Sequence, residues 1–199
     1  MNTQVHSITI EERDAAACVL ANAFADDPVF RYILGSRWNN EQRLRHLFNE
    51  SIATQLRKET HLVYRTDDGN AVALWHHIDD WQTPPIELVR SLPATIRAFG
   101  LSLPRAVRVL LSAEKVHPPE PHVHLAFIGT RDTHKGKGHG SALLASMIER
   151  CDERGVSAYL ESTNPANDAW YARFGFVSRG QVPLPNGAPV VTAMWRDPR

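Results

Sequence analysis

One stretch of this 199-residue chain, residues 122–161, limits its possible folds more than any other. Residues 122–130 form a strand-like run, and a basic glycine-rich turn follows. Residues 141–154 then place apolar side chains at helical spacing before Gly155 ends the helix. Residues 156–161 are a second strand-like run. A strand, a helix and a strand in this order predict two parallel neighbouring strands joined by a right-handed crossover.

The segments on either side predict a mixed, mostly antiparallel sheet with that parallel pair near its middle, flanked by helices, an α/β fold of the α+β type. Alternating and β-branched runs predict strands at residues 5–10, 61–66, 71–78, 122–130, 156–161, 177–182 and 190–195. Helical spacing predicts helices at residues 11–24, 40–58 and 141–154, with a short helix between Asn164 and Phe174. The aromatic residues Phe30, Tyr32 and Trp38 are expected in or near a connector, where they would cover the core.

Residues 81–120 are expected to form two or three short helices, because prolines interrupt their helical pattern. The arginines of this section give it a basic surface, which we interpret as a solvated face rather than an anionic-substrate site. These arginines are Arg90, Arg97, Arg105 and Arg108. Residues 1–199 suit one core and carry no internal repeat, so a single domain is expected, with residues 81–120 on its substrate side.

Charge and cysteine content exclude several classes of function. The 22 Lys and Arg residues balance 22 Asp and Glu residues, so no global positive field exists, and we expect neither a nucleic-acid nor a membrane partner. Cys18 and Cys151 lie in helix-like segments outside any zinc-binding spacing, which is typical of buried thiols in a reducing compartment. The N-terminus does not resemble a signal peptide and no apolar run approaches a membrane span, so a soluble cytoplasmic protein is expected.

The turn after residue 130 has the composition of an anion-binding loop. Gly136, Gly138 and Gly140 let backbone N–H groups approach a phosphate at a helix N-terminus, and Lys135 and Lys137 add positive charge. A Walker A loop is excluded, because histidine rather than lysine follows the second glycine. A dinucleotide fingerprint is disfavoured, because serine replaces its third glycine and the chain lacks repeated strand-helix-strand units.

A third interpretation accounts for more of the sequence. Residues 135–144, KGKGHGSALL, resemble the pyrophosphate loop of the GNAT superfamily of acyl-CoA-dependent N-acetyltransferases. Residues 159–176 are similar to the second signature of that family, in which a strand, an asparagine-rich turn and a helix end in tyrosine and Gly-Phe. Within the superfamily the chain most resembles puromycin N-acetyltransferase and its relatives, through residues 23–26 and 67–75, both signatures and Met194.

Four positions depart from the family pattern. Lys135 stands where arginine or glutamine is usual, Asp132 where proline is common, and Thr130 where valine is common. His139 occupies a position where an aliphatic residue normally packs under the loop. Lys135 keeps its charge and should still serve, and His139 is interpreted as an exposed or helix-start residue rather than a ligand of a CoA phosphate.

The resemblance implies a complete binding site for acetyl-CoA. Backbone groups of Ile128, Gly129 and Thr130 would receive the pantetheine arm, with a bulge splaying their strand from residues 156–161. Tyr171 is the implied general acid, which protonates the departing thiolate. The cofactor-binding set is Ile128, Gly129, Thr130, Lys135, Gly136, Lys137, Gly138, His139, Gly140, Ser141, Asn164, Asn167 and Tyr171. One of the two asparagines is also expected to cap a helix.

The general base is left open. Glu161, at the end of a strand, could take a proton from the acceptor ammonium directly or through water, or could pair with an arginine. His122 and His124 are second candidates, because residues two apart share one strand face. They would also suit a metal, but no third ligand is evident nearby, so no metal is expected.

By resemblance, then, the chain is an acetyl-CoA-dependent N-acetyltransferase that acts on a primary amine of a small molecule by direct transfer in a ternary complex. The alternative is a CoA-binding regulatory module without turnover. The acceptor is left open between an antibiotic, a metabolite, a polyamine and a peptide amine, and the sequence carries no signal for an oligomeric state.

Overall fold

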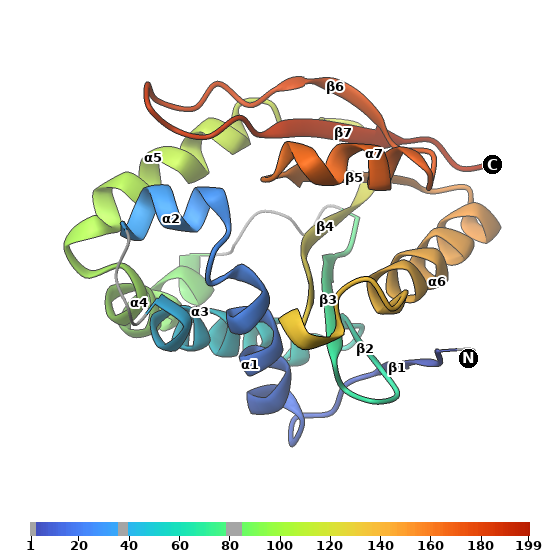
Figure 1. Cartoon of the computed structure of the whole chain (residues 1–199), viewed down its shortest axis with the longest axis horizontal. Coiled ribbons are helices and arrows are strands. Elements are labelled where there is room, and N and C mark those ends of the chain that lie inside the picture. The colour runs from blue at the N-terminus through green and yellow to red at the C-terminus, as the bar shows by residue number, and fades with distance from the viewer. Residues whose placement is uncertain (1–2, 36–39, 79–84) are drawn as a thin grey trace.

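The computed structural model describes residues 3–35, 40–78 and 85–199. Its centre is a sheet of seven described strands in the order β1-β2-β3-β4-β5-β7-β6 (Figure 1). The strands are β1 (Val5–Ser7), β2 (Leu62–Thr66), β3 (Ala71–His76), β4 (His122–Thr130), β5 (Ser157–Ser162), β6 (Val177–Gln181) and β7 (Thr192–Arg196). β4 and β5 are parallel neighbours and the other described pairs are antiparallel. The predicted mixed sheet is confirmed.

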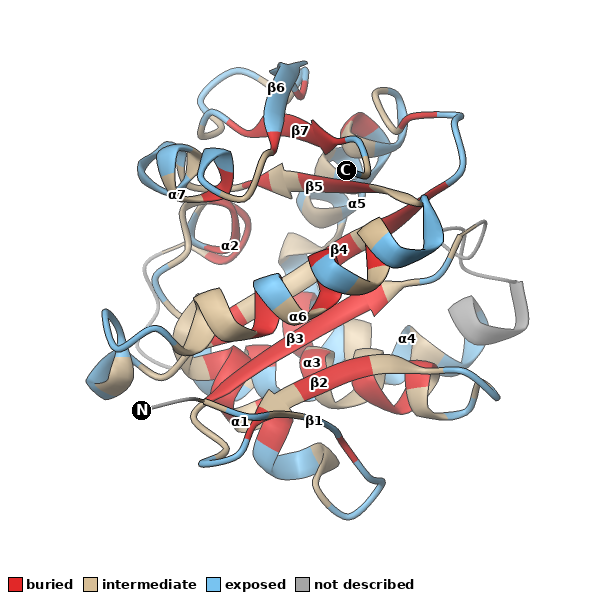
Figure 2. Cartoon of the chain, turned by 90° about the vertical axis from the view of Figure 1, so that its right-hand side faces the viewer, coloured by how far each residue is buried: buried red, intermediate tan, exposed pale blue. Residues whose placement is uncertain are grey.

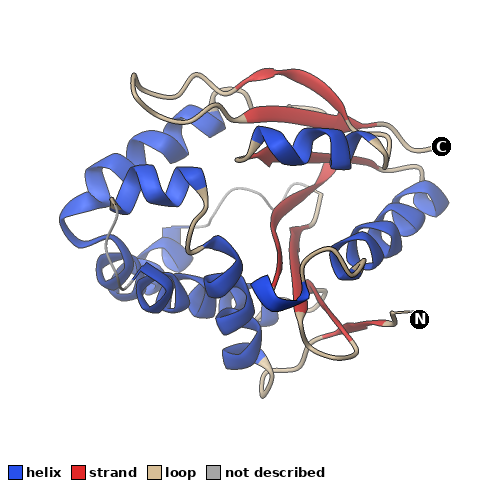
Figure 3. Cartoon of the chain, in the orientation of Figure 1, coloured by secondary structure: helices blue, strands red, loops and turns tan. Residues whose placement is uncertain are grey.

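Helices cover both faces of the sheet (Figure 3). They are α1 (Arg13–Phe24), α2 (Pro28–Leu34), α3 (Asn40–Leu56), α4 (Pro85–Phe99), α5 (Leu103–Glu114), α6 (His139–Arg154) and α7 (Asp168–Ala172). α1 and α3 lie on one face and α6 on the other, with a buried apolar cluster on each side. The predicted element bounds differ from these by at most three residues in most cases, and the differences fall at element ends.

β4 and β5 separate part-way along their length (Figure 2). Their pairing runs only from His122 opposite Ser157 to Leu125 opposite Leu160. On the other side of β4, the register with β3 shifts, because Leu74 faces Phe127 while the next residue of β3 faces Leu125. β4 therefore contains one extra residue, a bulge that increases the local twist and turns its second half away from β5. The bulge and the splay expected in this strand are confirmed.

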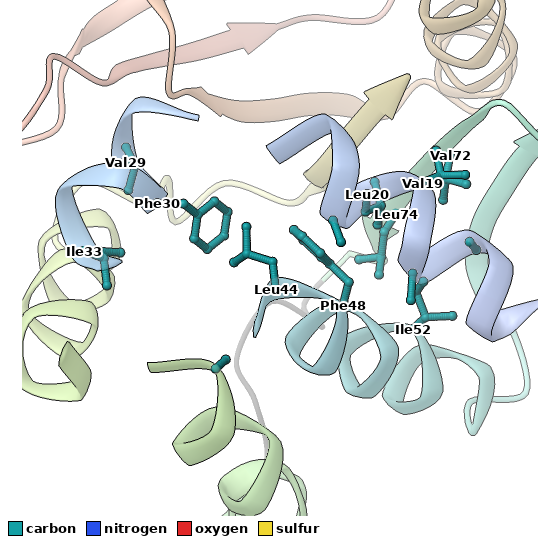
Figure 4. Close-up of a cluster of buried hydrophobic side chains, with 14 of the residues drawn as sticks. Val19, Leu20, Val29, Phe30, Ile33, Leu44, Phe48, Ile52, Val72 and Leu74 are labelled. Atoms are coloured by element: carbon teal, nitrogen blue, oxygen red, sulfur yellow. The ribbon is translucent and has the colours of Figure 1, made fainter. Parts of the chain in front are cut away.

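The placement of the early aromatic residues in a connector is wrong for Phe30 and Tyr32. Both lie in α2, and Phe30 packs into the cluster of buried side chains shown in Figure 4. The Asp27 carboxylate accepts hydrogen bonds from the backbone N–H groups of Val29 and Phe30, so Asp27-Pro28 begins a helix. Trp38 lies outside the described residues.

The described part of this section, residues 85–120, contains two main helices, but the division does not follow every proline. Pro93 lies inside α4, one helical turn after Val89, whose side chain is exposed to water. The break comes instead at Gly100, whose φ of 50° is left-handed and which starts a short 3-10 turn before α5. Arg105 is exposed as expected, yet its guanidinium also donates to the carbonyls of Tyr32 and Ile33 and so joins α5 to α2.

Candidate functional site

A cleft of about 800 Å³ opens beside the separated half of β4. Four parts of the chain line it: the α1–α2 corner, the end of β4, the glycine loop, and the turn after β5 together with α7. It brings together the predicted residues Ile128, Gly129, Thr130, Lys135, Gly136, Gly138, His139, Gly140, Ser141, Asn164, Asn167 and Tyr171. Lys137 and Glu161 are not among its lining residues.

The glycine loop leaves its backbone open to a ligand. Gly136 and Gly138 have backbone φ angles of 78° and 89°, which residues other than glycine rarely adopt. Apart from its chain neighbours, a Cβ at either position would meet no atom of the described residues within 4 Å, so the space beside these glycines is open. Gly138 is the N-cap of α6 and supplies no side-chain cap, which leaves first-turn N–H groups for an anion. This arrangement fits the diphosphate of CoA.

The side chains around the loop add charge and hold it in place. The Lys135 ammonium lies 2.6 Å from the Asp132 carboxylate, and both side chains are exposed. Ser141 Oγ accepts a hydrogen bond from Trp170 Nε1, which fixes α7 across the start of α6. Asp132, which stands where the family favours proline, therefore provides an ion-pair partner for Lys135, which stands where the family favours arginine or glutamine.

Of the two expected placements of His139, exposed or at a helix start, the structure shows the second, because His139 is the first residue of α6. Its side chain is 11% exposed, and its Nε2 lies 3.6 Å from Oδ2 of Asp68 in the turn between β2 and β3. The pKa of Asp68 is lowered, because hydrogen bonds from Thr66 and Asn70 and the charge of His139 outweigh the effect of burial. The imidazole thus contacts the turn between β2 and β3, and the same residue lines the cleft.

The second half of β4 offers an open edge. Ile128, Gly129 and Thr130 pair with β3 on one side, while pairing with β5 ends at Leu125. An extended ligand can therefore lie along the free side of β4 as an added strand. Gly129 is required by packing, because a Cβ there would lie 2.7 Å from the Cβ of Ala23 in α1.

Tyr171 is a largely buried residue at the wall of this cleft. The residue is 7% exposed and lines the cleft from α7. Its hydroxyl oxygen makes no hydrogen bond within the described ranges, and this oxygen is not fully buried. Burial, with the charges of Asp168 and Asp27, raises the pKa of Tyr171. The phenol therefore keeps its proton at neutral pH, which is the form that a general acid needs.

The turn after β5 is fixed by short-range hydrogen bonds. Asn164 Oδ1 accepts from the N–H of Ala166, so the predicted capping role belongs to Asn164. Asn167 makes no cap hydrogen bond with its side chain. The Thr163 hydroxyl donates to the carboxylate of Asp27, which ties this turn to the α1–α2 corner across the cleft.

Glu161 and the two strand histidines form a separate polar cluster near the point where the pairing of β4 and β5 ends. His124 Nε2 lies 2.7 Å from Glu161 Oε2, and His122 Nε2 lies 3.1 Å from His117 Nε2. The possible ion pair of Glu161 with an arginine is thus replaced by a pair with histidine. Sequence reasoning missed His117, although the spacing of three histidines within residues 117–124 was a signal for such a cluster.

Neither cysteine belongs to the cleft. Cys151 is buried in α6, where burial raises its pKa to about 11, and Cys18 is partly buried in α1. Within the described part of the chain, no group of three or more His, Cys, Asp or Glu side chains is arranged to hold a metal ion. The described helices likewise include none that combines the length and apolar character of a membrane span.

Comparison with known proteins shows the family of the chain. The model of the acetyltransferase (GNAT) family matches residues 24–176, which include both predicted signatures. The chain belongs to the GNAT acetyltransferase family. It is an acetyl-CoA-dependent N-acetyltransferase, and the glycine loop and the open edge of β4 are the features that suit this cosubstrate. The more specific likeness to puromycin N-acetyltransferase stays a prediction.

Individual relatives support the assignment. An uncharacterised N-acetyltransferase of Schizosaccharomyces pombe is 27% identical over 190 residues, covering 88% of this chain and 75% of the relative. A crystal structure from Corynebacterium glutamicum, described as histone acetyltransferase HPA2 and related acetyltransferase, is 28% identical with a TM-score of 0.76, covering 100% and 98% of the two chains. The PaiA N-acetyltransferase of Thermoplasma acidophilum, solved with coenzyme A, shares the fold at 11% identity and a TM-score of 0.60, covering 99% of each chain.

Proposed function

We propose that this GNAT enzyme transfers the acetyl group of acetyl-CoA to a primary amine of a small molecule, by direct transfer in a ternary complex. The observation that carries the proposal is that one cleft contains an open glycine loop, an unpaired strand edge and Tyr171. If the diphosphate of acetyl-CoA occupies the loop and its pantetheine arm follows β4, the thioester carbonyl lies toward the point where β4 and β5 separate.

Each part of the site has a defined task in this proposal. The loop Lys135, Gly136, Lys137, Gly138, His139, Gly140 and Ser141 binds the diphosphate with backbone N–H groups and lysine charge. Ile128, Gly129 and Thr130 hold the pantetheine arm, and one backbone N–H there polarises the thioester carbonyl. Asn164 and Asn167 border the same space. Tyr171 gives its proton to the sulfur as the carbon–sulfur bond breaks.

The acceptor nitrogen approaches from the other side of the opening. His124 stacks near Tyr159, which belongs to the core on the α1 and α3 face, whereas Tyr171 belongs to the core on the α6 face. A base at Glu161 or His124 and an acid at Tyr171 therefore reach the opening from opposite faces of the sheet. This separation suits direct attack of an amine on the carbonyl, with the thiolate leaving on the far side.

Enclosure supports a slim amine as the acceptor. The His124 and Glu161 side chains are only 16% and 17% exposed, so a nitrogen that reaches them must be carried on a narrow group. A primary amine on a flexible or small molecule meets this requirement. We propose that residues 1–199 act as one domain in the cytoplasm, with residues 81–120 bordering the acceptor side.

A panel of primary amines tests this function. Wild-type protein is incubated with acetyl-CoA and each amine, free thiol is measured over time, and the acetylated product is identified by mass spectrometry. The panel includes aminoglycosides, aminonucleosides, diamines, arylalkylamines and lysine-containing peptides. The proposal predicts that thiol and acetylated small amine appear in equal amounts. Turnover with peptides alone, or none with any amine despite acetyl-CoA binding, would contradict it.

A further inference from the structure

The polar cluster of Glu161 and the strand histidines has a defined arrangement of protons. His122 Nδ1 lies 2.6 Å from the backbone carbonyl of Glu120, which can only accept, so this nitrogen carries a proton. In the neutral ring, His122 Nε2 must then accept, and the proton of that contact comes from His117 Nε2. Burial lowers the pKa of His117 to about 4 and also lowers that of His122, which keeps both rings neutral at physiological pH.

The same reasoning fixes His124. Glu161 is the acceptor in its contact with His124 Nε2, because burial raises the pKa of this carboxyl less than the charge and hydrogen bond of His124 lower it. The Nε2 of His124 therefore carries a proton, and in the neutral ring Nδ1 has the lone pair. This Nδ1 makes no hydrogen bond within the described residues, yet it is not sealed from solvent.

The two candidate bases thus differ in what they can reach. One carboxylate oxygen of Glu161 is engaged by His124, and the other lies 4.0 Å from Nδ1 of His117. The hydroxyl of Tyr159 is buried beside the same carboxylate, and this negative charge, after burial itself, raises the pKa of Tyr159. The two side chains are exposed to a similar extent, 17% for Glu161 and 16% for His124. They differ in their contacts: the Glu161 carboxylate faces His124, His117 and Tyr159, whereas His124 keeps one ring nitrogen without a hydrogen bond in the described part of the chain.

We propose that His124 is the catalytic base that takes a proton from the acceptor nitrogen, and that Glu161 is a positioning residue that holds the Nε2 proton and directs Nδ1 to the substrate. This inference rests on the proposed function and names the residue that carries out its first proton transfer. A carboxylate that orients an imidazole in this way also stabilises the imidazolium that forms.

The proton balance of the reaction is complete with these groups. An acceptor that arrives as an ammonium gives one proton to Nδ1 of His124, and its lone pair then forms the bond to the carbonyl carbon. The carbon–sulfur bond breaks, and Tyr171 supplies the proton of the CoA thiol. The second proton of the nitrogen returns through solvent to the phenolate, and His124 releases its proton to solvent. One proton is released overall, and no further reactant is needed.

Three variants separate this arrangement from direct catalysis by Glu161. His124→Ala should lower kcat about 100-fold or more, the usual range for a lost general base, with an unchanged KM for acetyl-CoA. Added imidazole should restore part of the kcat. Glu161→Gln keeps an oxygen that can accept the Nε2 proton, so it should retain clearly more activity than Glu161→Ala. The control is His46→Ala on the exposed surface of α3, which should leave kcat unchanged.

If Glu161 is itself the base, Glu161→Gln should be as inactive as Glu161→Ala, and His124→Ala should stay active without rescue by imidazole. A turnover-independent measurement tests the geometry even if no amine in the panel is accepted. In ¹⁵N NMR of histidine-labelled protein, His124 should be the Nε2–H tautomer and should lose that preference in Glu161→Ala. An Nδ1–H tautomer, or a tautomer unaffected by the substitution, would overturn the proposal while leaving the proposed function standing.

Discussion

Replacing Gly138 with glutamate should abolish acetyl-CoA binding, and the structure gives the size of the effect. The new side chain would project into the open space beside the glycine loop, where, apart from its chain neighbours, no atom of the described residues lies within 4 Å of its Cβ. A carboxylate about 5 Å from a diphosphate charge repels it by roughly 3 kcal/mol at an effective dielectric constant of about 20. This repulsion alone weakens binding about 100-fold, before the loss of backbone contacts is added.

A matched variant separates binding from strain. Gly138 has a φ of 89°, so any other residue there also pays a backbone cost of about 1–3 kcal/mol. Gly187, in the turn between β6 and β7, has a φ of 81°, and a Cβ there also meets nothing within 4 Å. Gly187→Glu should therefore lose similar stability and keep its affinity.

The assay is isothermal titration of acetyl-CoA into wild type and both variants, with thermal unfolding as the measure of stability. Gly138→Glu should raise Kd at least 100-fold, whereas Gly187→Glu should stay within threefold of wild type. Unchanged affinity in a folded Gly138→Glu protein would refute the placement of the diphosphate. Equal losses in both variants would show that strain, not repulsion, causes the effect.

Three other variants test packing and chemistry. Gly129→Ala brings a Cβ to 2.7 Å from a side chain of α1 and should destabilise the protein by about 1–3 kcal/mol in urea unfolding; no change would show that α1 can move. The double variant Cys18→Ala/Cys151→Ala should keep acetyl transfer, whereas inactivity in the folded protein would point to a covalent acetyl-enzyme. Asp152→Ala leaves the Arg196 guanidinium, 3% exposed, without its carboxylate and should cost about 3–5 kcal/mol. The hydrogen bond from Arg196 lowers the pKa of Asp152 from 3.8, so this stabilisation is present above pH 3.8 and is lost as the pH falls further. Acid unfolding that is identical in variant and wild type would contradict the assignment.

The sequence predicted the sheet because its signals are local. Strand, loop and helix follow one another within residues 122–161, and each has its own periodicity and its own stop signal. The α2 helix was missed because its seven residues are too few to show a period, and its start depends on one side chain, Asp27. Pro93 was expected to interrupt a helix, because proline removes a backbone donor and its ring crowds the carbonyl four residues earlier, but α4 continues past it.

The candidate site was predictable only where motif and geometry coincide. The glycine loop and Tyr171 carry recognisable patterns, and the fold brings them to one cleft. The contact between His124 and Glu161 joins residues 37 positions apart, and it depends on the register of two parallel strands, which sequence alone does not give. The burial of His139 likewise depends on a distant turn that contains Asp68.

The central claim, that Tyr171 completes an acetyl-transfer site in this cleft, is tested most directly by comparing Tyr171→Phe with wild type. The substitution removes one oxygen that makes no hydrogen bond within the described chain, so folding and acetyl-CoA affinity should be unchanged. Turnover of acetyl-CoA with an accepted amine should fall at least tenfold, which corresponds to about 1.4 kcal/mol or more in the barrier. Full turnover in Tyr171→Phe, with the same affinity, would contradict the account.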